Sequence, residues 1–120
     1  MSVKRGEIYV VSLIEKDSRG QEIGKKRPAI IVQADLWNKY LPSTIILPLT
    51  SQEPVYLGTA NVLLEKGGSG LEVDSFVLFP QLRSVDKSRL EKKIGELSNT
   101  KMQAVDKALS LTLGLTPLDS

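Results

Sequence analysis

The side chains best suited to chemistry are an arginine and a threonine at the ends of two apolar segments. Arg27 directly precedes Pro28 and the apolar residues 29–32, and Thr50 directly follows a second apolar segment, residues 45–49. If the two segments form neighbouring strands, one sheet presents a guanidinium beside a hydroxyl. A guanidinium can contact two phosphate oxygens at once and stays charged, and the hydroxyl can donate one further hydrogen bond. This pair therefore suits a phosphodiester substrate.

The rest of the composition narrows the chemistry. The chain contains no histidine and no cysteine, which excludes disulfides, thiolate zinc sites, thiol nucleophiles and the usual base of a serine triad. The carboxylates show no tight cluster typical of a metal site, so we expect no metal and no cofactor. Glu22 and Asp74 are candidate bases, but an isolated carboxylate in a loop is usually only solvated.

RNA cleavage stays open because RNA carries its own nucleophile. The 2′-hydroxyl can attack the adjacent phosphorus, so the protein need only align it and stabilise charge on the phosphoryl oxygens. Arginine is a poor proton shuttle near neutral pH, so we expect an electrostatic role for Arg27. The sequence does not indicate which groups act as the general base and the general acid.

Size and charge are typical of one ordinary globular domain. We expect residues 1–120 to form a single domain, and 41% hydrophobic with 25% charged residues argues against disorder. No apolar run approaches the roughly 18 residues of a membrane helix, and the first residues lack a signal-peptide core. We therefore expect a cytoplasmic protein without membrane contact. The net charge of +2 supports nucleic-acid binding only weakly. Basic residues gather within residues 16–27 and 87–93, and each of these two groups is equally consistent with a solvated surface.

Hydrophobic patterning predicts short strands followed by one helix. Strands are expected at residues 6–13, 27–33, 44–50, 61–64, 75–85 and 93–96. Residues 15–26 are expected to form a long, functional loop. Proline cannot donate to a β-ladder, so Pro28 is expected at a strand start or edge, Pro48 at an edge or bulge, and Pro80 at a bulge.

The predicted helices are a short turn and a longer C-terminal helix. Asp35 is expected to cap a helical turn through residue 40. Ser98 is expected to cap a helix whose apolar residues recur at helical spacing through Leu113, and Gly114 and Pro117 should stop it. These elements together predict a mainly β fold with a C-terminal α-helix, arranged as a small twisted barrel with the helix packed on it.

Four segments, in order along the chain, resemble one known family. Residues 20–35 (GQEIGKKRPAIIVQAD) resemble the signature region of MazF/PemK-type toxins, which are endoribonucleases of bacterial toxin–antitoxin systems. Residues 4–9 (KRGEIY), 44–52 (TIILPLTSQ) and 81–90 (QLRSVDKSRL) resemble the same family. Together these segments extend the likeness over almost the whole chain.

The resemblance implies an SH3-like barrel (CcdB/MazF-like) that works as a homodimer. It implies metal-independent, sequence-specific cleavage of single-stranded mRNA, which arrests translation and growth. Attack by the 2′-hydroxyl would leave a 2′,3′-cyclic phosphate and a 5′-hydroxyl, and the C-terminal tail of a cognate antitoxin would cover the RNA-binding surface. The family's catalytic pair falls on Arg27 and Thr50. The expected RNA-binding residues are Glu22, Lys25, Lys26, Ser51, Gln81 and Arg83.

Two residues depart from the family pattern, and two other functions stay open. Ile23 stands where the family more often has glutamine, and Pro80 where an acidic residue is common, so we expect both to affect which RNA sequence is cleaved.

A CcdB-like gyrase inhibitor could share this barrel, because a fold does not fix a function. Such proteins act through a C-terminal Trp-Gly-Ile, whereas the only tryptophan here is Trp37. A non-catalytic RNA-binding barrel is disfavoured by the scarcity of aromatic residues for stacking.

Overall fold

Antiparallel strands form the larger part of the regular secondary structure. The computed structural model describes residues 2–16, 18–55 and 61–116. Within these residues the strands are β1 (Glu7–Lys16), β2 (Glu22–Ile31), β3 (Ser43–Thr50), β4 (Leu63–Leu64), β5 (Ser75–Val77), β6 (Arg83–Asp86) and β7 (Leu90–Glu96). The helices are α1 (Asp35–Tyr40), α2 (Asn99–Thr112) and the 3-10 helices η2 (Phe79–Gln81) and η3 (Lys87–Arg89).

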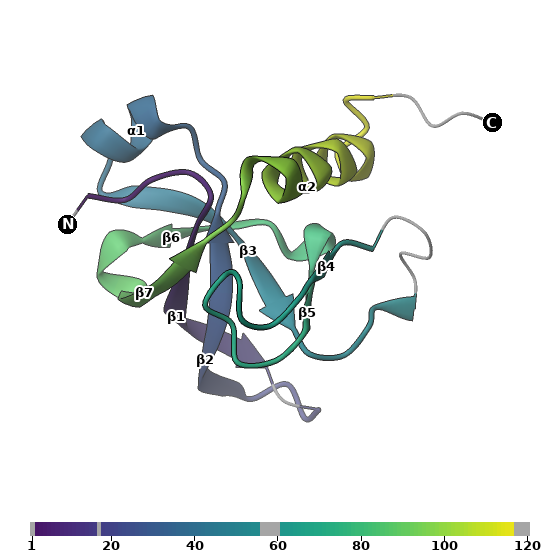
Figure 1. Cartoon of the computed structure of the whole chain (residues 1–120). Coiled ribbons are helices and arrows are strands. Elements are labelled where there is room, and N and C mark those ends of the chain that lie inside the picture. The colour runs from purple at the N-terminus through teal and green to yellow at the C-terminus, as the bar shows by residue number, and fades with distance from the viewer. Residues whose placement is uncertain (1, 17, 56–60, 117–120) are drawn as a thin grey trace.

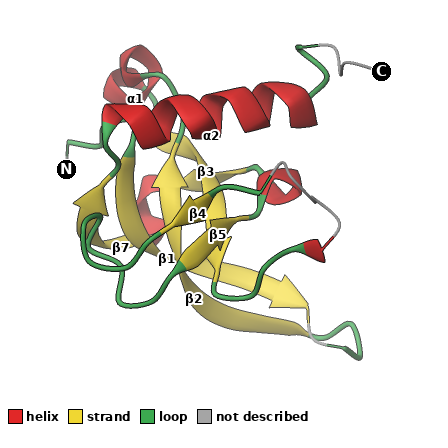
Figure 2. Ribbon diagram, turned by 45° about the vertical axis from the view of Figure 1, so that its right-hand side comes forward, coloured by secondary structure: helices red, strands yellow, loops and turns green. Residues whose placement is uncertain are grey.

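The strands form one strongly curled sheet with α2 lying across it (Figures 1 and 2). Their order is β4-β5-β3-β2-β1-β7, and β6 pairs with β3 beside this path. The two ends of the path meet through backbone contact: a Cβ atom on Gly70, before β5, would lie only 1.8 Å from the carbonyl oxygen of Ile94 in β7. This arrangement confirms the predicted mainly β, barrel-like fold with a C-terminal helix.

Apolar side chains fill both faces of the curled sheet. One cluster joins β1, β2 and β3 to Val105 and Ala108 of α2. The other lies between β1, β2, β3, β6 and β7, and its members include Val11, Ile31 and Leu90. Because side chains alternate across a strand, residues of β2 contribute in turn to the two clusters. Both faces of its C-terminal half are therefore buried.

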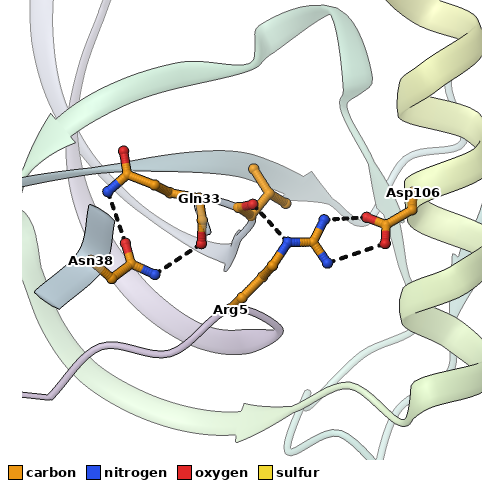
Figure 3. A network of polar contacts seen from close by, with 5 residues as sticks. Arg5, Gln33, Asn38 and Asp106 are labelled. Atoms are coloured by element: carbon orange, nitrogen blue, oxygen red, sulfur yellow. Dashed lines mark hydrogen bonds and ion pairs between the residues drawn. The ribbon is translucent and has the colours of Figure 1, made fainter. Parts of the chain in front are cut away.

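Polar contacts fix the helices to the sheet (Figure 3). Arg5 donates from Nε to the carbonyl oxygen of Val32 at 2.9 Å, and its guanidinium forms an ion pair with Asp106 of α2. Gln33 donates to Oδ1 of Asn38, and Asn38 donates back to the carbonyl oxygen of Gln33, each at 2.9 Å. The first contact ties the N-terminal segment to α2, and the second holds α1 beside the end of β2.

The predicted long loop at residues 15–26 is wrong. Most of this segment is a β-hairpin in which Glu15 pairs with Ile23 and Lys16 with Glu22. Hydrogen bonds between backbone groups form this ladder, and they do not depend on the type of side chain. Both faces of the outer part of the hairpin are exposed to solvent. The outer part of the hairpin therefore lacks the alternation of apolar and polar residues that predicts a half-buried strand. The strand expected at 6–13 therefore continues to Lys16.

Pro28 and Pro80 both lie where strand pairing is interrupted. Pro28 is inside β2 and not at its start, but β3 pairs with β2 only from Ala29 onward, so Pro28 is at a local edge, which is one of its two predicted places. Pro80 breaks the strand expected at 75–85, because η2 separates β5 from β6. A proline removes a ladder donor, and at Pro80 the chain turns instead of continuing as a strand.

The helix termini are partly as predicted. Ser98 caps α2 by accepting a hydrogen bond from the backbone N–H of Lys101 at 3.2 Å, and Gly114 follows the helix with φ of +73°. Pro117 lies outside the described residues. Asp35 is not the cap of α1, since that position belongs to Ala34. Its carboxylate instead accepts from the backbone N–H of Arg5 at 2.7 Å.

Candidate functional site

Strand register brings Arg27 and Thr50 to the same face of the sheet. Ala29 of β2 lies opposite Pro48 of β3. Arg27 and Thr50 are each two residues beyond that pair, so the period of two places both side chains on one side. The sheet therefore presents the guanidinium and the hydroxyl together, as the sequence predicts.

A proline separates the two strands at this point. The backbone N–H of Val32 donates to the carbonyl oxygen of Ile45 at 2.9 Å. Hydrogen-bonded pairs recur at every second residue of an antiparallel ladder, which makes residues 28 and 49 the next such pair after 30 and 47. Pro28 has no N–H to donate, and pairing between β2 and β3 ends at Ala29.

A hollow of about 400 Å³ lies where the strands part. Its lining includes three cations and three hydroxyls, namely Lys25, Lys26, Arg27, Thr50, Ser51 and Ser75. Cations and hydroxyl donors around a concave surface are the groups that bind phosphate oxygens. The hollow is thus suited to a phosphodiester or to another anion.

Arg27 is held by a carboxylate that the sequence did not reveal. Its Nε donates to Oε1 of Glu15 at 2.7 Å, and its Nη2 donates to Oε2 at 3.4 Å. The hydrogen bond from Arg27 lowers the pKa of Glu15, with further lowering by the charges of Lys25 and Arg83. Both side chains of the pair are about four-fifths buried, at 22% and 21% exposure. The sequence analysis did not identify Glu15 as a site residue, because it placed residues 15–26 in a loop.

Thr50 keeps its hydroxyl proton available. Its Oγ1 accepts a hydrogen bond from the backbone N–H of Gln52 at 3.2 Å. A hydroxyl accepts through its lone pairs and donates through its single proton, so the bond to Gln52 leaves the donor free to face the hollow. Thr50 can therefore supply one positioned donor beside Arg27.

The other predicted residues divide into two groups. Lys25, Lys26 and Ser51 line the same hollow as the candidate pair. Lys26 also forms an ion pair with Glu91 of β7, with Nζ and Oε1 separated by 2.9 Å. These three residues remain candidates for phosphate contact.

Glu22, Gln81 and Arg83 do not line this hollow. Glu22 starts β2 and is five residues from Arg27, or about 16 Å along an extended strand. Gln81 is exposed at the end of η2, and Arg83 starts β6 and lines a separate hollow with Leu13. Arg83 still acts on the candidate site, since its charge helps to lower the pKa of Glu15. A role for these three residues requires an RNA that extends beyond the hollow.

The described residues show neither a cluster of metal ligands nor a membrane-spanning helix. Among residues 2–16, 18–55 and 61–116, no three aspartates and glutamates gather into a group that could hold a metal ion. No helix in this part of the chain is long and apolar enough to cross a membrane.

Comparison with known proteins identifies the family. A model of the family described as PemK-like, MazF-like toxin of type II toxin-antitoxin system matches residues 4–113. The chain belongs to this toxin family.

Several solved structures share the fold. The chain is 19% identical to an endoribonuclease from a mycobacterial species, with a TM-score of 0.76 over 99% of this chain and 97% of the other. A mycobacterial endoribonuclease in complex with its cognate antitoxin gives 20% identity and a TM-score of 0.73, covering 98% of each chain. The MazE–MazF complex (Form-II) from Deinococcus radiodurans gives 25% identity and a TM-score of 0.71, covering 97% of this chain and 99% of the other.

Proposed function

We propose that this member of the toxin family is a metal-independent endoribonuclease that cleaves single-stranded RNA at the hollow beside Arg27 and Thr50. The observation that carries the proposal is the shared face of these two residues at the gap between β2 and β3. The endoribonucleases among the similar structures support the same activity. Both residues keep the catalytic roles that the family resemblance assigns to them.

The proposed reaction uses the nucleophile of the substrate. The 2′-hydroxyl loses its proton as its oxygen bonds to phosphorus, and the 5′-oxygen gains a proton as its bond to phosphorus breaks, which leaves a 2′,3′-cyclic phosphate and a 5′-hydroxyl. Negative charge grows on the non-bridging oxygens in the transition state. Arg27 neutralises that charge and Thr50 donates one hydrogen bond to it, and preorganised donors of this kind act most strongly in a site that excludes water.

The proposed partners follow from charge and from the similar complexes. Lys25 and Lys26 add positive charge beside Arg27, which strengthens phosphate contact without selecting a base. The same charge would attract an acidic antitoxin tail, and antitoxins are bound in the mycobacterial and Deinococcus complexes. We propose a cytoplasmic, single-domain toxin that acts as a homodimer, cleaves mRNA at a short sequence and thereby arrests growth until its antitoxin binds.

The proposed activity is tested by incubating the purified protein with mixed-sequence single-stranded RNA in excess EDTA. We expect cleavage at a few short sequences, because no step requires a divalent ion. Matched double-stranded RNA and single-stranded DNA should stay intact, since DNA lacks the 2′-hydroxyl. If the RNA stays intact while the protein inhibits supercoiling by gyrase, the gyrase-inhibitor alternative is correct instead.

A further inference from the structure

Glu15 reaches Arg27 along the face that carries the candidate site. In the hairpin, Arg27 pairs with Val11, and Glu15 pairs with Ile23. Glu15 and Val11 are four residues apart, so Glu15 lies on the same face as Arg27. The contact between the two charged groups therefore spans the intervening pair of Leu13 and Lys25. Leu13 is almost fully buried, so an apolar side chain lies on this face between the two charged residues.

The carboxylate occupies only one edge of the guanidinium. Glu15 accepts from Nε and from Nη2, which together form one fork of donors. A guanidinium has five N–H donors, so the fork of Nη1 and Nη2 can still hold two phosphate oxygens. Within the described part of the chain, Nη1 of Arg27 makes no hydrogen bond to the protein. Glu15 and a phosphate can therefore bind Arg27 together.

The environment of Glu15 disfavours a role as proton acceptor. Arg27, Lys25 and Arg83 all lower the pKa of its carboxyl group. A carboxylate with a lowered pKa is a weaker base than an ordinary one, whereas an efficient general base has its pKa near the working pH. Holding a neighbouring group in place needs no proton transfer and is strengthened by the same charges.

We propose that Glu15 is a positioning residue, which fixes the guanidinium of Arg27 so that its second fork faces the scissile phosphate. This inference rests on the proposed endoribonuclease function. The carboxylate also lowers the affinity for RNA, because its negative charge lies near the phosphate-binding hollow. Glu15 thus weakens RNA binding while it improves the geometry of the reaction.

Glu15→Gln separates these two effects. The substrate is an oligoribonucleotide that contains one cleavage sequence mapped from a wild-type digest. We expect kcat to fall on the order of 10- to 10²-fold, since a misplacement of about 1 Å can cost about 10²-fold. We expect KM to fall or stay unchanged, because a negative charge near the phosphates is gone. A residue that served only stability would not improve binding while it lowered kcat.

Glu91→Gln is the matched control. Glu91 pairs with Lys26 at 2.9 Å, so this variant removes the same charge from the same basic cluster without touching Arg27. We expect its kcat to equal that of the wild type. An unchanged kcat in Glu15→Gln, or an equal fall of kcat in both variants, would overturn the positioning role. A wild-type protein that cleaves no RNA would instead refute the proposed function itself.

A measurement on the wild-type protein makes the test independent of how the variant folds. The ¹⁵N NMR signal of the Arg27 Nε–H reports its hydrogen bond to Glu15. We expect this proton to stay protected from exchange when the same oligonucleotide, with a 2′-deoxy sugar at the cleavage position, saturates the protein. If saturation exposes the proton, the phosphate displaces Glu15 and the positioning role is wrong.

Discussion

At the scale of single residues, Arg27 and Thr50 are each held by one neighbour and each keep a donor free. Glu15 takes one fork of the guanidinium, and the backbone N–H of Gln52 takes a lone pair of the hydroxyl. Restraining a side chain before the substrate arrives lowers the entropy lost at the transition state. The pair is therefore preorganised for an anion, which is the condition for electrostatic catalysis.

Thr50→Val tests the hydroxyl with little change in shape. We expect kcat to fall about 10²–10³-fold, the usual cost of losing one preorganised donor. Thr50→Ser is the matched variant, since it restores the hydroxyl without the methyl group, and it should keep most of the activity. Single-turnover cleavage rates check both variants. A valine variant as active as the serine variant would remove the hydroxyl from the proposed mechanism.

The shared location of Arg27 and Thr50 could be predicted from the sequence, whereas the contact of Glu15 with Arg27 could not. The first two stand where an apolar segment meets polar residues, and this boundary is visible without a structure. Glu15 acquires its role from the pairing of β1 with β2, and no local pattern shows which arginine a carboxylate will meet. Its position in phase with the buried Val11 and Leu13 was the available signal, since residues two apart share a face of a strand.

At the scale of elements, Pro28 keeps β2 and β3 apart where the hollow lies. Residues 28 and 49 would form the next hydrogen-bonded pair between these strands, but proline has no N–H to donate. Residues of both strands line the hollow at this gap. On the opposite edge of β3, Leu49 lies across from Val77 of β5. We therefore expect the missing N–H of Pro28 to contribute to the opening at the candidate site.

Pro28→Ala should close the gap. The new N–H can donate to the carbonyl oxygen of Leu49 and extend the ladder, which narrows the hollow and lowers kcat/KM by about 10-fold or more, on the scale expected for misplaced catalytic groups. Hydrogen exchange of the new amide, measured by NMR, should show protection. A freely exchanging amide together with wild-type activity would contradict this view of Pro28.

Pro48→Ala is the control for that experiment. The carbonyl oxygen of Pro48 accepts from the backbone N–H of Leu78, so this residue's backbone groups point away from β2. Its substitution adds an N–H that cannot extend the ladder between β2 and β3. We expect activity close to that of the wild type.

Element types were more predictable than element ends. The C-terminal helix shows a clear cap at Ser98 and a helical apolar period, and the central strands are continuous apolar segments. The outer hairpin has no buried face, so its strands leave no pattern in the sequence. The break at Pro80 depends on the turn of η2 between two sheet regions, which is a tertiary feature.

At the scale of the whole molecule, glycines let the β4–β5 connection contact β7, so that the curled sheet is barrel-like although no strand pairing within the described residues closes it. Gly70 has φ of +85°, and its Cα faces the backbone of Ile94 and Gly95. Gly95 faces the backbone of Ser69 in turn, where a Cβ atom would lie 1.9 Å from the carbonyl oxygen. Two backbones can approach this closely only where both residues lack a side chain. The contact joins the β4–β5 connection to β7.

Gly70→Ala should separate these two segments. The added methyl group overlaps the Ile94 carbonyl and the backbone conformation disfavours a side chain, so we expect a loss of about 1–3 kcal/mol in the free energy of unfolding. Gly68→Ala is the control, because a Cβ atom there meets nothing within 4 Å. Urea unfolding followed by circular dichroism measures both. Equal midpoints would show that this contact does not stabilise the fold.

The most direct test of the central claim compares the RNA products of the wild-type protein and Arg27→Ala in excess EDTA. We predict wild-type fragments with 2′,3′-cyclic phosphate and 5′-hydroxyl ends, identified by mass spectrometry. Arg27→Ala should keep the wild-type circular dichroism spectrum and cleave at least about 10²-fold more slowly. Equal rates for the two proteins, or wild-type cleavage only after a divalent ion is added, would contradict the proposed mechanism.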